Sequence, residues 1–163
     1  MSAPLVVIIM GSKSDGDHCE NIAAAVRSFG IEVVLRVGSA HKTPAHVSAM
    51  LAAYEADGRP KVYITVAGRS NALSGFVDGS VSAPVIACPP ESQAFGGADL
   101  FSSVRMPSGI APALVMDGAN AALFAAKILG QCDPAIVRSV AAYMEANARK
   151  ILEDDKALGK PDA

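Results

Sequence analysis

The feature that most constrains this fold is the regular alternation of short apolar runs with longer helical patterns. Five runs rich in β-branched and other apolar residues have the length of buried strands. Helical patterns follow most of these runs. Alternation of this kind is typical of a parallel sheet covered on both faces, so we predict an α/β fold: a three-layer α/β/α, doubly wound parallel sheet of flavodoxin-like type with an extended C-terminal helix. The predicted strands are residues 5–10, 31–37, 61–66, 84–87 and 113–116, and the predicted helices are about 16–29, 44–56, 118–129 and 134–153.

The length of the chain sets the expected domain organisation. Its 163 residues leave room for one domain of ordinary size, and no repeat or linker interrupts the pattern. We expect a single domain over residues 1–163, with a core at about 4–130 and a terminal helix at about 134–153. Residues 154–163 turn polar, and we expect this tail to fray.

Composition excludes several classes of protein. A net charge of −2 offers no basic surface for nucleic acid. No apolar run is longer than Leu5–Met10, which is far short of the roughly 20 residues that span a bilayer, so no membrane partner is expected. Only 18% of the residues are charged and 51% are apolar, against roughly 25% charged in an average soluble domain. A small monomer would struggle to cover its surface with so few charges, which predicts a homo-oligomer.

The three cysteines indicate a reducing compartment. Cys19, Cys88 and Cys132 are odd in number, widely spaced and outside any C-x-x-C pair. Neither a disulfide framework nor a zinc site is predicted from that pattern. We expect free, buried thiols in a cytoplasmic protein.

Ligands of doubly wound sheets bind beyond the carboxyl ends of the strands, so the loops there are the functional candidates. The first is residues 11–15, Gly-Ser-Lys-Ser-Asp. Its glycine lets the backbone approach a ligand, the hydroxyls of Ser12 and Ser14 can donate, and the following helix N-terminus favours an anion. The loop is neither a P-loop nor G-x-G-x-x-G. It suits a phosphate or polyol, with the alternative that Ser14 or Asp15 merely caps a helix.

The second loop, residues 39–42, holds the best catalytic candidate. His41 stands at a strand end between Ala40 and Lys42, close to Ser39, and a histidine can exchange a proton near neutral pH. The other histidines, His18 and His46, fall in helical patterns and are expected at the solvated surface. No histidine spacing fits a metal site.

The third loop, residues 67–75, combines glycines with hydrogen-bond donors. Gly68, Arg69, Ser70 and Asn71 would suit a small carboxyl or phosphate group. The alternative is an ordinary βα turn in which Arg69 pairs with a surface carboxylate. G-x-S-x-G is absent, so a hydrolase elbow is not expected.

Taken together, these loops resemble those of the phosphoribosylaminoimidazole carboxylase family of purine biosynthesis. The likeness runs from about residue 5 to 130, with the motifs in order and at the family's spacing. The matching stretches are Gly11–Asp15, Ser39–Pro44, Ala67–Asn71, Pro84–Pro90, Met106–Gly109 and Asn120–Leu123.

Two classes of this family differ at residues that can be compared here. Class I, a mutase that moves a carboxyl group from the exocyclic nitrogen to the ring carbon, has Arg where this chain has Lys42. It also has His where this chain has Ala72, and Gly-Ala-Ala in place of residues 69–71. These departures resemble class II, which carboxylates 5-aminoimidazole ribonucleotide directly with carbon dioxide. The mutase remains the alternative, and a non-catalytic flavodoxin-like module is a remote one.

The resemblance implies roles for individual residues. His41 would carry the proton of the reacting carbon, and Gly68 and Ser70 would meet carbon dioxide and the nascent carboxylate. The nucleotide would be bound without cofactor or metal by Ser12, Asp15, Ser39 and Lys42, with Ser14, Arg69 and Asn71 as further candidates.

The resemblance also implies an octamer whose C-terminal helix reaches onto a neighbouring subunit. An apolar stripe on that helix suits this role, although packing on its own domain is the alternative. The stripe contains Ile136, Val140, Tyr143, Met144 and Ile151.

Overall fold

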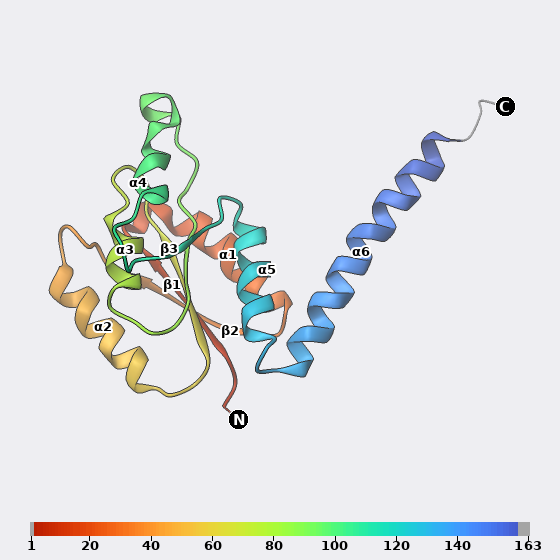
Figure 1. Ribbon diagram of the computed structural model, residues 1–163. Coiled ribbons are helices and arrows are strands. Elements are labelled where there is room, and N and C mark those ends of the chain that lie inside the picture. Colours follow the sequence, from red (N-terminus) through yellow and green to blue (C-terminus); the bar gives the residue numbers. More distant parts are fainter. Residues whose placement is uncertain (1, 160–163) are drawn as a thin grey trace.

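The computed structural model describes residues 2–159. Five strands form one parallel sheet in the order β2-β1-β3-β4-β5, which is the flavodoxin-like order. The predicted fold class is therefore confirmed (Figure 1). The elements are β1 (Leu5–Met10), η1 (Lys13–Asp15), α1 (Gly16–Ser28), β2 (Glu32–Val37), α2 (Pro44–Ala56), β3 (Lys61–Val66), α3 (Ala72–Asp78), β4 (Val85–Ala87), η2 (Ala94–Leu100), α4 (Phe101–Val104), β5 (Ala113–Leu114), α5 (Gly118–Leu129) and α6 (Pro134–Leu158).

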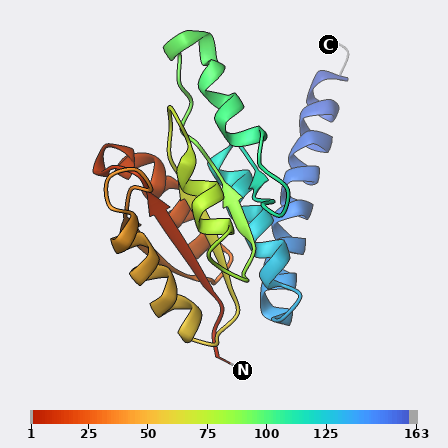
Figure 2. The ribbon, with the colours of Figure 1, turned by 60° about the vertical axis from the view of Figure 1, so that its left-hand side comes forward.

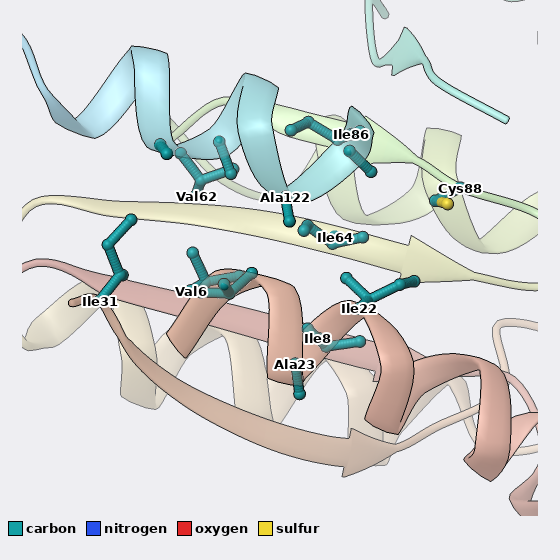
Figure 3. Packing of buried hydrophobic residues seen from close by; sticks show 14 of the residues in the cluster. Val6, Ile8, Ile22, Ala23, Ile31, Val62, Ile64, Ile86, Cys88 and Ala122 are labelled. Carbon is teal, nitrogen blue, oxygen red and sulfur yellow. The ribbon is translucent and has the colours of Figure 1, made fainter. Parts of the chain in front are cut away.

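Helices cover both faces of the sheet because successive strand residues point to opposite sides. In β1, Val6 and Ile8 pack with α1 and α5, whereas Val7 and Ile9 pack with α2 and α3. Every residue of β1 and β3 is buried, as expected for strands covered on both faces. Figure 3 shows the first of these layers, where side chains of β1, β3 and β4 meet those of α1 and α5.

Small residues set the spacing of that layer. The buried face of α5 contains Ala121, Ala122, Ala125 and Ala126, each fully buried. Because alanine side chains are short, α5 lies close to both α1 and the sheet. Part of the chain's large apolar content is therefore buried within its own core.

The structure corrects the sequence-based boundaries between β3 and α5. Residues 72–78 form α3, although the third loop was predicted to run to residue 75; the side chain of Asn71 caps this helix by accepting a hydrogen bond from the Ser74 amide (3.2 Å). The short helices η2 and α4 were not predicted. Only Ala113 and Leu114 form β5, two residues fewer than expected, because the edge strand pairs only with Ile86 and Ala87 of β4.

The terminal helix is longer than predicted. It continues through residues 154–158, which were expected to fray, and ends at Gly159. Lys156, Ala157 and Leu158 are good helix formers, and no glycine or proline interrupts the segment before residue 159. The remainder of the predicted tail, residues 160–163, lies outside the described residues.

The apolar stripe of α6 divides between two environments. Ile136 and Val140 are buried on the chain's own domain, and the ring of Tyr143 packs edge-on against Phe29 with centroids 5.4 Å apart. Beyond Val140 every described residue of the helix is exposed, and the helix leaves the body of the domain (Figures 1 and 2). Within residues 2–159, none of the helices combines the length and apolar character needed to cross a bilayer.

Two expectations about single residues are wrong. His18 is half-buried rather than solvated, because the first turn of α1 places its Nε2 3.7 Å from Sγ of Cys88. Cys132 is exposed, because it lies in the turn between α5 and α6; Cys19 and Cys88 are buried and all three cysteines are free. His46 is exposed, as predicted.

Candidate active site

A cavity of about 710 Å³ lies where the loops after β1, β2, β3 and β4 meet. Parallel strands bring their carboxyl ends to one edge of the sheet, so loops distant in sequence converge there. Nine of the ten predicted site residues line this cavity, and only Asn71 does not. The nine are Ser12, Ser14, Asp15, Ser39, His41, Lys42, Gly68, Arg69 and Ser70.

The loop after β1 is held by its own serines. Oγ of Ser12 accepts hydrogen bonds from the Ser14 amide (3.3 Å) and the Ser14 hydroxyl (2.9 Å), and so caps the short helix η1. Asp15 occupies the N-cap position of α1, yet its side chain makes no capping hydrogen bond. Its carboxylate lines the cavity instead, so the capping alternative does not account for Asp15.

The loop after β2 is a tight ring closed by Ser39 and Thr43. The Thr43 amide donates to the Ser39 carbonyl (2.9 Å), and Oγ1 of Thr43 accepts from the Ser39 amide (3.0 Å). The Lys42 amide donates to Oγ of Ser39 (3.2 Å). This ring presents the exposed side chains of His41 and Lys42 at the cavity, a general acid–base group beside a fixed cation.

Gly38 places this ring against α2. A Cβ at Gly38 would lie 2.8 Å from Cγ2 of Val47 and 3.1 Å from Cε of Met50. Both side chains are buried, and the Gly38 amide donates to the carbonyl of Met10 at 2.9 Å. Glycine is therefore required where the chain leaves β2 and passes the first turn of α2.

The loop after β3 turns Arg69 and Ser70 toward the cavity and Asn71 away from it. Arg69 has φ +55°, in the left-handed region that non-glycine residues rarely adopt. Asn71 is buried: its Oδ1 accepts from the Ser74 amide and its Nδ2 donates to Oγ of Ser103 (2.9 Å). The alternative prediction was that Arg69 pairs with a surface carboxylate. Among the described residues Arg69 forms no ion pair, so the structure does not support that alternative.

Sequence reasoning missed the contribution of the loop after β4. Pro90, Glu91 and Ser92 line the same cavity, and Glu91 adds a second carboxylate to that of Asp15. Their position in the sequence could have indicated a role in the site, because these residues follow strand 84–87 just as the three predicted loops follow their strands.

The cavity suits a nucleotide-sized ligand with an anionic end. Its volume lies in the range of small-molecule sites. The ammonium of Lys42 and the serine hydroxyls can bind phosphate, and carboxylates such as Asp15 can accept hydrogen bonds from sugar hydroxyls. In residues 2–159, no three His, Cys, Asp or Glu side chains gather where they could hold a metal ion.

Cys88 lies at the end of β4 but offers no nucleophile. Burial is the largest cause that raises its pKa, with the nearby Asp117 carboxylate second, and the value reaches about 12. The thiol is therefore protonated at neutral pH and behaves as a small apolar side chain.

Comparison with known proteins identifies the family. Residues 5–150 match the model of the AIR carboxylase family. A phosphoribosylaminoimidazole carboxylase of Treponema denticola is 61% identical over 155 residues, which are 95% of this chain and 98% of the relative. The Homo sapiens bifunctional phosphoribosylaminoimidazole carboxylase/phosphoribosylaminoimidazole succinocarboxamide synthetase is 47% identical over 125 residues, 77% of this chain and 29% of that protein.

A solved structure agrees with these relatives. The crystal structure of Treponema denticola PurE has a TM-score of 0.95 and 60% sequence identity, and covers 96% of this chain and 99% of that one. The resemblance that rested on six short motifs is thereby confirmed, and the chain belongs to the AIR carboxylase family.

Proposed function

We propose that this protein is an enzyme of purine biosynthesis that carboxylates 5-aminoimidazole ribonucleotide with carbon dioxide, reversibly and without ATP. The observation that carries the proposal is the convergence of His41, Lys42 and Ser70 on one nucleotide-sized cavity. These side chains supply a proton carrier, a phosphate-binding cation and a donor for a carboxylate.

The choice of carbon dioxide as co-substrate rests on three features of the loops. Lys42, Ala72 and the Arg-Ser-Asn sequence at 69–71 resemble the class that uses carbon dioxide directly rather than the mutase class. Lys42 and residues 69–70 line the cavity, so the differences fall where substrate would bind.

The chemical step needs one proton carrier. The electron-rich ring carbon of the aminoimidazole attacks carbon dioxide, and the new carbon–carbon bond leaves that ring carbon bearing both hydrogen and carboxylate. The imidazole of His41 removes this proton. The electron pair of the broken carbon–hydrogen bond returns to the aminoimidazole ring and restores its aromaticity. The proton then passes from His41 to solvent; in the reverse direction His41 protonates the ring carbon before carbon dioxide leaves.

The remaining residues position the two substrates. Ser12, Asp15, Ser39 and Lys42 bind the ribose phosphate, with Ser14 at the same end of the cavity. Carbon dioxide carries no charge, so Gly68, Ser70 and the backbone amides of their loop orient it and stabilise the new carboxylate. Arg69 adds a cation at that end, and Asn71 supports the loop from behind, because its buried side chain caps α3.

The working form of the enzyme is a cytoplasmic homo-oligomer, which we propose to be an octamer. One exposed face of α6 supports this assembly: Val137, Met144, Ile151 and Leu158 follow one another at seven-residue intervals, with exposed fractions of 50%, 51%, 67% and 87%. Residues seven apart share a helix face, so this stripe is an apolar surface that a neighbouring subunit can cover.

An ATP-free assay tests the function directly. Purified enzyme is incubated with 5-aminoimidazole ribonucleotide and carbon dioxide, supplied as bicarbonate with carbonic anhydrase, and the C-carboxylated product is followed. Product that forms in proportion to enzyme supports the proposal. If only the N-carboxylated ribonucleotide reacts, the protein is the mutase and the proposed co-substrate is wrong.

A further inference from the structure

Two adjacent serines of α4 reach back to the loop after β3. Oγ of Ser102 accepts a hydrogen bond from the Asn71 amide at 2.9 Å. The same oxygen lies 2.9 Å from the Arg69 carbonyl and 2.7 Å from the Asp99 carbonyl, and its hydrogen is donated to one of these. Ser102 is separated from these loop residues by 31 to 33 positions, so only the tertiary fold brings them together.

The two groups that Ser102 contacts in the loop flank Ser70. The carbonyl of Arg69 belongs to the peptide unit before Ser70, and the amide of Asn71 belongs to the peptide unit after it. Because a peptide unit is planar and trans, holding the Arg69 carbonyl also fixes the direction of the Ser70 amide, which points the opposite way. The Ser70 carbonyl is fixed as well, since it accepts from the Ala72 amide at 3.0 Å.

Ser103 holds the same segment from its buried side. Its hydroxyl accepts from Nδ2 of Asn71, and both residues are only 3% exposed. Oδ1 of Asn71 in turn caps α3 through the Ser74 amide. A buried polar group that loses its partner is costly, so this chain of bonds strongly favours one position of the loop.

The backbone itself shows that the loop needs such support. Arg69 stands at φ +55°, and a non-glycine residue stays in this region only where the surroundings hold it there. Ser102 and Ser103 supply that constraint from α4, which lies on the projecting segment beyond the carboxyl end of the sheet (Figures 1 and 2).

We propose that Ser102 is a positioning residue for the carbon dioxide end of the site, an inference that rests on the proposed function. Through its contacts with the peptide units on both sides of Ser70, it directs the Ser70 amide toward the place where the carboxylate forms. Ser12, Asp15, Ser39 and Lys42, which bind the nucleotide, lie on other loops that Ser102 does not hold. Loss of the Ser102 hydroxyl therefore weakens the use of carbon dioxide and spares nucleotide binding.

The test compares Ser102→Ala with Ser102→Thr, which keeps the hydroxyl. Ser102 lines a separate cavity of about 310 Å³, so the extra methyl of threonine has room. Ser48→Ala, which removes an exposed hydroxyl on α2, is the matched control. For each variant we would measure the apparent KM for carbon dioxide and for the nucleotide, kcat, and hydrogen exchange of the peptide that contains the Asn71 amide.

The loss of one hydrogen bond of this kind corresponds to about a tenfold fall in kcat/KM for carbon dioxide in Ser102→Ala. The nucleotide KM should change by about twofold or less, exchange at Asn71 should accelerate, and Ser102→Thr should restore all three values. Equal loss for both substrates, or faster exchange with unchanged use of carbon dioxide, would show that Ser102 has only a structural role.

The two proposals can fail separately in this experiment. A wild-type enzyme that performs no ATP-free carboxylation refutes the proposed function and the role of Ser102 in it. A wild-type enzyme that is active, beside a Ser102→Ala variant with unchanged kcat/KM for carbon dioxide, refutes the positioning role alone.

Discussion

Replacing Gly38 by alanine tests whether packing against α2 positions the loop that carries His41. The added methyl would lie 2.8 Å from Cγ2 of Val47, whereas ordinary contacts begin at 3.4 Å, so the neighbours must separate by about 0.6 Å. Val47 is fully buried in the layer beneath α2, and a β-branched side chain in a helix has essentially one rotamer. The first turn of α2 must therefore move rather than the side chain alone.

The expected losses of stability and of kcat follow from this overlap. Overpacking of a buried site costs about 1–3 kcal/mol of folding free energy. For a chain of this length, each kcal/mol lowers Tm by about 2–4 °C. The first turn of α2 is bonded to the ring of residues 39–43, because the Val47 amide donates to the Thr43 carbonyl at 3.1 Å. A shift of this size displaces His41, and kcat should fall by about tenfold or more, since a misplacement of 1 Å can cost about 100-fold.

Thermal unfolding and steady-state kinetics of three variants provide the assay. Gly58→Ala is the matched control, because a Cβ there meets nothing within 4 Å and the residue is exposed. The double variant Gly38→Ala/Val47→Ala removes the clash and should recover part of the lost kcat, although Val47→Ala alone destabilises the core. A Gly38→Ala enzyme with wild-type Tm and kcat would show that packing against α2 does not position the loop of His41.

Three further predictions concern the proton carrier, the buried thiols and the terminal helix. His41→Asn should abolish turnover while isothermal titration still detects the nucleotide; wild-type turnover would remove His41 as the proton carrier. Burial raises the pKa of both Cys19 and Cys88 from 9.0 to about 12, so the folded chain holds these protons more tightly than the unfolded chain. Stability is therefore full below about pH 9 and falls as the pH rises toward 12. Urea unfolding at pH 8, 9 and 10 should show a smaller decline in Cys88→Ala, and an identical decline would contradict this account. Ile151→Glu places a charge in the exposed stripe of α6 and should lower the native mass measured by light scattering; an unchanged mass would exclude that stripe from the interface.

The sequence predicted the elements whose signals are local. The buried strands 5–10 and 61–66 are short runs of mostly apolar, β-branched residues bounded by loop residues, and the structure keeps these limits. The motifs at the ends of these strands could also be recognised as parts of one site, because loops after parallel strands converge whatever the details of packing. For this reason the order of strands and loops along the chain is enough to assign His41, Lys42 and Ser70 to one site.

Other features were missed because they depend on contacts between distant residues. The start of α3 depends on Asn71, whose amide group is held by Ser103 from 32 positions away. The segment that includes η2 contains three successive residues with positive φ, one of them Phe95, and no local pattern predicts such a turn. His18 was misplaced because a polar residue in a helix gives no indication that Cys88 of a distant strand will lie beside it.

The class of fold, the edge of the sheet that binds ligands and the family could all be predicted from the amino-acid sequence, since periodicity and motif spacing are properties of neighbouring residues. The orientation of each candidate residue, in contrast, depends on the tertiary structure. It directed Ser70 into the cavity and Asn71 into the interior, added Glu91 to the cavity lining, and placed Ser102 against the loop after β3. The physical reason is that burial and hydrogen bonding of a side chain depend on what packs around it, and in this chain those neighbours come from other strands and helices.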